Sequence, residues 1–121
     1  MSRLDDIRKL PDRTKAFAVS IIRFFSDLPK TEVARTIGRQ LLRSGTSVAA
    51  NYRAACRARS SADFISKISV VLEETDETLF WLELLAQAEV IDQSKTRSLH
   101  AECEELLKIF ATSRATAKAN R

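Results

Sequence analysis

Glycine, proline and cysteine are scarce in this sequence, with two of each among 121 residues. So few turn-forming residues argue against a sheet protein with many hairpins and favour helices. Cys56 and Cys103 form no Cys-x-x-Cys motif, which excludes a disulfide framework and indicates a reducing, cytoplasmic location. Charged residues interrupt every apolar run before the roughly 20 residues that a membrane span requires, so we expect no membrane partner.

Side chains on which many enzymes depend are scarce as well. His100 is the only histidine, and its position within an apolar helical pattern favours a surface or partly packed residue over a catalytic base. The chain has no His-Glu-x-x-His motif, no zinc-type spacing of cysteine and histidine, and no glycine-rich phosphate loop. We therefore predict a non-enzymatic protein with no metal, no organic cofactor and no small-molecule substrate.

The composition is typical of one globular domain. The chain is 45% hydrophobic and 30% charged, with a formal net charge of +4. This balance argues against a disordered chain, and the length suits one domain better than two. We predict a single domain over residues 1–121, with flexible ends at residues 1–11 and 114–121.

Apolar residues recur with the spacing of α-helices in four segments. The predicted helices begin near Asp12, after Thr31, after Ser60 or Ser61, and near Ser94. Serine, threonine and aspartate are typical N-cap residues, and Pro29 ends the first helix. Short connections make successive helices antiparallel neighbours, so the sequence predicts an all-α, up-and-down four-helix bundle.

The second predicted helix is long, because its apolar spacing continues through Gly45. Its core-facing stripe consists of Val33, Ile37, Leu41, Ser44, Val48, Tyr52 and Ala55. This spacing is close to the natural pitch of an α-helix, while Gly45 favours a bend. We expect Ser47 and Asn51, one turn apart, to satisfy backbone groups loosened by the bend, with ligand contact as the alternative.

Five arginines lie on the opposite side of this helix. On a helical wheel they fall within one narrow band, which forms a ridge about 33 Å long. The members of this arginine face are Arg35, Arg39, Arg43, Arg53 and Arg57. Like charges at i,i+4 repel, and no acid follows Glu32 on this helix, so we expect an acidic partner.

Two identities of that acidic partner stay open. One is a phosphate backbone, because a row of guanidinium groups neutralises a nucleic acid without reading its sequence. The other is this same protein, since residues 33–62 carry a net charge of +6 and residues 63–105 a net charge of −8. Candidate carboxylates on the next helix or on a neighbouring subunit are Glu73, Glu74, Asp76 and Glu77.

The segment QLLRSGTSVAANYRAA, residues 40–55, resembles the signature segment of four-helix bundle proteins related to the 23S rRNA intervening sequence protein family. The similarity continues through residues 63–68 and 77–85 and covers about residues 14–110. It implies a long, bent second helix and a ring of five protomers. It also implies a link to nucleic acid, because a related accessory protein of diversity-generating retroelements is a basic pentamer that works with a reverse transcriptase.

These patterns together predict a cytoplasmic homo-oligomer, with a pentamer as the expected form. We expect it to bind RNA, DNA or a ribonucleoprotein partner through the five arginines. The alternative is a protein-interaction scaffold, in which a head-to-tail interface pairs the arginines of one subunit with the acids of the next.

Overall fold

The computed structural model describes residues 9–121, and over this range it contains four α-helices and no strand. The helices are α2 (Leu10–Ser26), α3 (Glu32–Cys56), α4 (Ser61–Gln87) and α5 (Arg97–Ala119), with a short 3-10 helix, η1 (Gln93–Lys95), before α5. The all-α prediction is thereby confirmed. None of these described helices combines the length and the apolar character needed to cross a membrane.

Two of the predicted helix starts are confirmed by their capping hydrogen bonds. The Thr31 hydroxyl accepts from the backbone N–H of Ala34 at 3.2 Å, and the Ser60 hydroxyl accepts from that of Asp63 at 3.0 Å. The predicted N-cap at Asp12 is wrong, because α2 already begins at Leu10. Proline is favoured in the first turn of a helix, and here it occupies the position just before Asp12.

The C-terminal helix extends further than its sequence pattern indicated. We expected a flexible end over residues 114–121, whereas α5 continues to Ala119. It begins at Arg97, after η1, rather than at Ser94. At the other end of the chain, residues 1–8 of the expected flexible segment lie outside the described residues, and α2 starts at Leu10.

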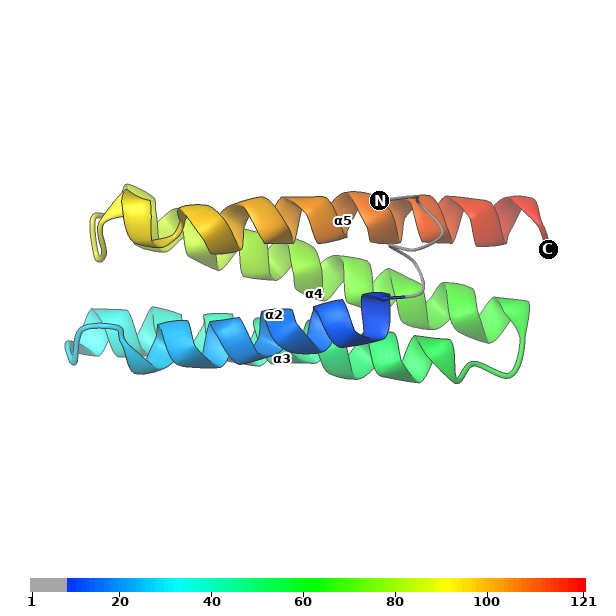
Figure 1. Ribbon diagram of the computed structural model, residues 1–121, viewed down its shortest axis with the longest axis horizontal. Helices are drawn as coiled ribbons and strands as arrows, with labels where there is room; N and C mark the ends of the chain where they lie inside the picture. The colour runs from blue at the N-terminus through cyan, green and yellow to red at the C-terminus, as the bar shows by residue number, and fades with distance from the viewer. Residues whose placement is uncertain (1–8) are drawn as a thin grey trace.

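The four helices run up and down as a bundle, and sequence neighbours lie side by side (Figure 1). Helices α2 and α5 contact each other far less than any pair of successive helices does. A groove of about 540 Å³ follows this seam, and Arg13 spans it with two hydrogen bonds to Glu102, at 2.8 Å and 2.7 Å. The bundle is therefore tightly packed on three sides and more open on the fourth.

Side chains from all four helices fill the core. The largest fully buried residues are Phe110, Leu10, Ile21, Leu41, Ile68, Leu82, Leu85, Leu106, Val48, Val71, Thr14 and Thr75. The predicted stripe of α3 is confirmed at Leu41, Ser44, Val48 and Tyr52 but is wrong at Val33, which is 58% exposed. Val33 lies at the edge of the stripe in the first helical turn, where Ala34 faces the core instead.

Helix α3 continues without interruption across Gly45, as the spacing predicted. The bend that we expected there stays a prediction. A different role for the glycine is visible: a Cβ atom at Gly45 would lie only 2.9 Å from two side-chain carbons of Ile21. The lack of a side chain thus lets α2 and α3 approach closely at mid-length.

Candidate nucleic-acid interface

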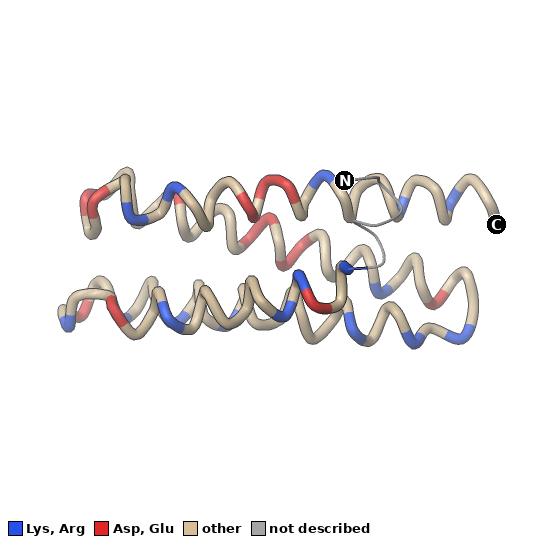
Figure 2. The backbone as a smooth tube through the Cα atoms, viewed as in Figure 1, with Lys and Arg blue, Asp and Glu red and all other residues tan. Residues whose placement is uncertain are grey.

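Four of the five arginines of the arginine face lie on α3, the fifth, Arg57, is the C-cap residue of that helix, and all five are exposed. The core stripe fixes the orientation of the helix, so residues opposite that stripe point away from the bundle. Figure 2 shows basic positions along α3, whereas acidic positions gather in the middle of α4 and α5. The charge segregation seen in the sequence is therefore also a segregation in space.

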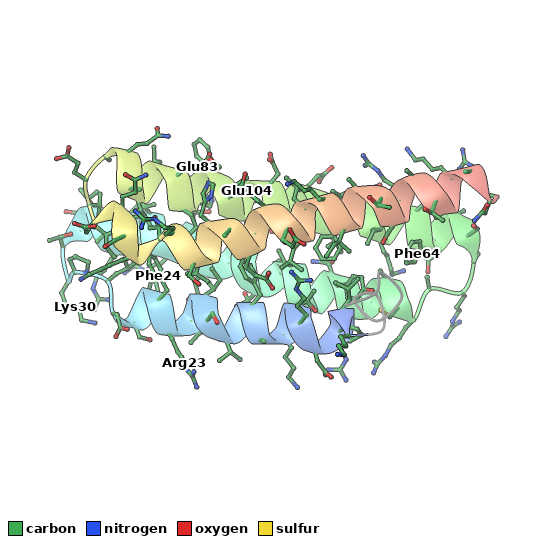
Figure 3. The ribbon with its side chains drawn as sticks, turned by 45° about the horizontal axis from the view of Figure 1, so that its top comes forward. Arg23, Phe24, Lys30, Phe64, Glu83 and Glu104 are labelled. Carbon is green, nitrogen blue, oxygen red and sulfur yellow. The ribbon has the colours of Figure 1, made fainter. Side chains whose placement is uncertain are left out.

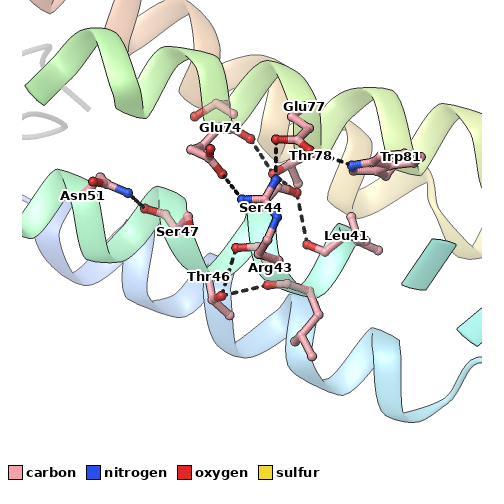
Figure 4. Close-up of polar contacts among 12 residues, drawn as sticks. Leu41, Arg43, Ser44, Thr46, Ser47, Asn51, Glu74, Glu77, Thr78 and Trp81 are labelled. Atoms are coloured by element: carbon pink, nitrogen blue, oxygen red, sulfur yellow. Dashed lines mark hydrogen bonds and ion pairs between the residues drawn. The ribbon is translucent and has the colours of Figure 1, made fainter. Parts of the chain in front are cut away.

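Arg43 is the member of the arginine face that has an acidic partner within the chain. Its guanidinium donates to Glu77 at 2.6 Å and to Glu74 at 3.2 Å, both on α4 (Figure 4). The hydrogen bond to Glu77 is the main cause that raises the pKa of Arg43, and the same bond lowers the pKa of Glu77. Arg43 therefore joins α3 to α4. This is the pairing with acids of the same protein that was expected as the alternative to phosphate contact.

The other four arginines have no such partner. Within residues 9–121, the side chains of Arg35, Arg39, Arg53 and Arg57 form no hydrogen bond or ion pair. Arg35 and Arg39 lie in the N-terminal half of α3, while Arg53 and Arg57 line a groove between α2 and α3. Four exposed positive charges are thus uncompensated by the described part of the chain.

The four candidate carboxylates of α4 divide into two pairs. Glu74 and Glu77 face α3 and bind Arg43, and Glu77 also accepts from the indole N–H of Trp81 at 3.3 Å. Glu73 and Asp76 are exposed and lie on the outward side of α4. The structure therefore brings two of the four acids to one arginine and leaves two directed away from the bundle.

The three residues expected around a bend in α3 have separate contacts. The Asn51 side-chain amide donates to the backbone carbonyl of Ser47 at 2.9 Å, one turn earlier (Figure 4). Gly45 contacts Ile21 across the α2–α3 seam. The predicted backbone role of Asn51 has a partner here, although that partner lies on the C-terminal side of Gly45.

A buried polar contact between α3 and α4 was not predicted. The Thr78 hydroxyl donates to the Ser44 hydroxyl at 2.9 Å, and the Ser44 hydroxyl donates to the backbone carbonyl of Leu41 at 3.2 Å (Figure 4). The Thr78 hydroxyl also lies 2.7 Å from the backbone carbonyl of Glu74. The position of Ser44 within the apolar stripe of α3 is a signal for such a contact. The matching signal on α4 is that Thr78 follows Thr75 and Val71 on the core side.

His100 links α4 to α5. Its ring nitrogens lie 3.0 Å from Glu83 Oε2 and 3.1 Å from Glu104 Oε1, and Figure 3 shows these two carboxylates near each other on neighbouring helices. The side chain of His100 is partly buried. This arrangement is that of a packed surface histidine held between acids.

The structure supports electrostatic contact better than it supports a reaction centre. Guanidinium groups present planar donor forks that suit phosphate oxygens. The arginine face contains no aromatic side chain on which a base could stack. The arginine face therefore offers donors that suit a polyanion backbone and, among its residues, no platform for base stacking.

Comparison with known proteins agrees with the fold. The family described as 23S rRNA-intervening sequence protein matches residues 9–112. A similar crystal structure is that of a protein of unknown function from the S23 ribosomal protein family of Bacteroides thetaiotaomicron. It is 36% identical, with a TM-score of 0.80, over 86% of this chain and 96% of that chain. No curated protein matches the sequence.

Proposed function

This chain belongs to the 23S rRNA-intervening sequence protein family, and from that premise we propose that it is an oligomeric bundle protein that binds nucleic acid or a ribonucleoprotein electrostatically. The contact surface is the arginine face of α3. The activity is non-enzymatic, and the proposed location is the reducing cytoplasm that the two-cysteine composition indicates. The proposed assembly is a homopentameric ring, with α3 bent at Gly45.

The uncompensated charge of α3 is the observation that carries this proposal. Arg35 and Arg39 are one turn apart on α3, and Arg53 lies one turn before the C-cap residue Arg57, so the like charges of each pair repel. No described carboxylate relieves that repulsion. A phosphate backbone in contact with α3 relieves such repulsion, and counterion release from the nucleic acid supplies the binding free energy.

A second candidate function is a protein-interaction scaffold, and the Arg43 ion pairs favour it. They show that guanidinium groups of α3 and carboxylates of α4 are complementary within one chain. The same pairing between subunits would use Glu73 and Asp76, which point outward. In this function the arginines hold an assembly together and do not contact phosphate.

The salt dependence of RNA binding tests the first function. We expect the affinity for single-stranded and structured RNA to fall steeply as salt rises. In the double variant Arg35→Glu with Arg39→Glu, the slope of log affinity against log salt should fall by about 1.4 to 1.8, because each lost phosphate contact removes about 0.7 to 0.9. The double variant Lys108→Glu with Lys118→Glu is the control, since it makes the same change in charge on exposed positions of α5.

Equal losses in both double variants would contradict the proposal, because the effect would then follow net charge and not the arginine face. Absence of RNA binding by the wild-type protein at low salt would also contradict it. The scaffold function predicts a different result, namely an assembly of lower molar mass in light scattering for the Arg35→Glu with Arg39→Glu variant. Measuring molar mass and RNA affinity on the same samples distinguishes the two functions.

A further inference from the structure

An apolar groove runs along the outer side of the seam between α2 and α3. Its volume is about 670 Å³, and its apolar lining includes Val19 and Ile22 of α2 with Ala49 and Ala50 of α3. Val19 is 41% exposed and Ile22 is 47% exposed. Small alanines opposite two branched side chains leave a hollow that a larger apolar side chain would fill.

The rim of this groove is basic. Lys15, Arg53 and Arg57 line it, and Asp12 is the one carboxylate among its lining residues. Neither arginine has an ion-pair partner within residues 9–121. The groove therefore fits a partner that combines apolar side chains with carboxylates.

A surface of that composition is present on α4. Val70, Glu73 and Phe80 lie on its outward side, where Val70 is 39% exposed and Phe80 is 51% exposed. Phe80 is held by an edge-to-face contact with Trp81, with ring centroids 4.9 Å apart. We call Val70, Glu73 and Phe80 the α4 stripe.

The groove and the α4 stripe lie at similar heights along the bundle. Helices α3 and α4 run antiparallel, and the contact between Thr78 and Ser44 fixes their alignment. Counting along both helices from that contact, α4 residues 70–80 lie roughly level with α3 residues 52–42, because both helices rise by about 1.5 Å per residue. The lining that α3 and its C-cap residue give to the groove spans residues 46–57, and Gly45 lies beside Ile21. Copies related by a rotation about an axis along the bundle therefore bring Val70 and Glu73 level with this lining and Phe80 close to the Ile22 end of the groove.

We propose that the α2–α3 groove of one copy receives the α4 stripe of a second copy. Phe80 and Val70 cover the apolar lining, and Glu73 lies near Lys15 and Arg53 on the rim. Both surfaces of the contact are present on the same chain. A second copy therefore supplies the complementary surface, and no other acidic protein is needed. The inference rests on the oligomer of the proposed function and identifies its interface.

The two surfaces are different patches, so the contact is head-to-tail and each copy offers one of each. Rings or filaments form in this way, whereas a two-fold dimer does not. The interface also divides the arginine face: Arg53 and Arg57 belong to assembly, while Arg35 and Arg39 stay available to a polyanion. The two roles can therefore be tested on different residues.

A charge-swap series measured by light scattering tests the interface. We expect Arg53→Glu and Glu73→Arg each to lower the molar mass of the assembly to that of the monomer, because like charges then face each other. Combining both changes in one chain should restore the wild-type molar mass. Phe80→Ser should also give monomers, whereas Val33→Ser, which changes an apolar residue of similar exposure elsewhere, should not.

The inference is overturned if the wild-type protein is monomeric, or if Arg53→Glu and Phe80→Ser keep the wild-type molar mass. All altered side chains are exposed, and circular dichroism checks that each variant is folded. RNA affinity is measured separately with Arg35→Glu and Arg39→Glu. If Arg35→Glu and Arg39→Glu lose RNA binding while Arg53→Glu keeps the wild-type molar mass, the proposed function stands and only this interface is removed.

Discussion

At the scale of single residues, the two cysteines differ sharply in their surroundings. Cys103 is fully buried on α5, and its thiol donates to the backbone carbonyl of Thr75 at 3.3 Å. Burial, aided by the negative charge of Asp76 and other nearby carboxylates, raises the pKa of Cys103 to about 12. Cys56, the last residue of α3, is exposed.

We expect one thiol of the folded protein to react with a chromogenic disulfide reagent at pH 8, and the second to react only after unfolding. The thiolate is the nucleophile, and Cys103 stays protonated at this pH because its pKa is raised. The Cys56→Ser variant should therefore show no fast reaction. Two equally fast thiols in the native protein would mean that α5 is not packed as the structure has it.

Gly45 is the residue whose role changed most between sequence and structure. In the Gly45→Ala variant the new Cβ atom would meet Ile21, a stiff and fully buried side chain, at 2.9 Å. Overpacking costs about 1–3 kcal/mol and alanine regains about 1 kcal/mol of helix propensity, so we expect a net loss of about 1 kcal/mol. Urea denaturation measures this change in the free energy of unfolding.

Gly38→Ala is the matched variant. Its new Cβ atom would meet the outer carbons of Leu28 and Phe25, which can shift more easily than the branched base of Ile21. We expect a smaller loss than at Gly45. A Gly45→Ala protein that is as stable as Gly38→Ala would show that the contact with Ile21 costs no more than the contacts at Gly38.

At the scale of helices, the ion pairs of Arg43 connect α3 to α4 in a pH-dependent way. The Arg43 hydrogen bond lowers the pKa of Glu77 below its ordinary value of 4.5. A carboxyl group with a lowered pKa stabilises the fold above the pKa of the unfolded chain, and this contribution is lost as pH falls through the lowered value. The pair is partly exposed, so its contribution is about 0.5 kcal/mol.

We therefore expect Glu77→Gln to lower the free energy of unfolding by about 0.5 kcal/mol at pH 7 and by less as pH falls below 4.5. Denaturation curves at both ends of this range measure the difference. Glu73→Gln is the control, because Glu73 is exposed and has no partner within the described residues. Equal effects of the two substitutions would show that the contact with Arg43 does not stabilise the fold.

The helices themselves could be predicted from the sequence, since apolar spacing reports the core side of each one directly. Thr31 and Ser60 were predictable as caps because their side chains act within one turn. The errors at Asp12 and Val33 both lie in a first helical turn. There, the exact helix boundary and the helix packed opposite decide which residue is buried. The apolar spacing gives information on neither.

At the scale of the whole molecule, the charge segregation predicted that α3 and α4 are electrostatically complementary. The wheel also placed all five arginines on the outward side, as the structure has them. Which acid meets which arginine was not predictable, because that depends on the relative height of two helices. The Ser44–Thr78 contact sets this height and brings Glu74 and Glu77 to Arg43.

The open seam between α2 and α5 has a consequence for how the protein folds. Nearly all helix packing joins neighbours in sequence, whereas Arg13 and Glu102, which span the seam, are 89 positions apart. Chains dominated by local contacts fold quickly, in about microseconds to milliseconds, because little loop entropy is lost before contacts form. The bundle can thus grow one hairpin at a time, with the contact between α2 and α5 forming last.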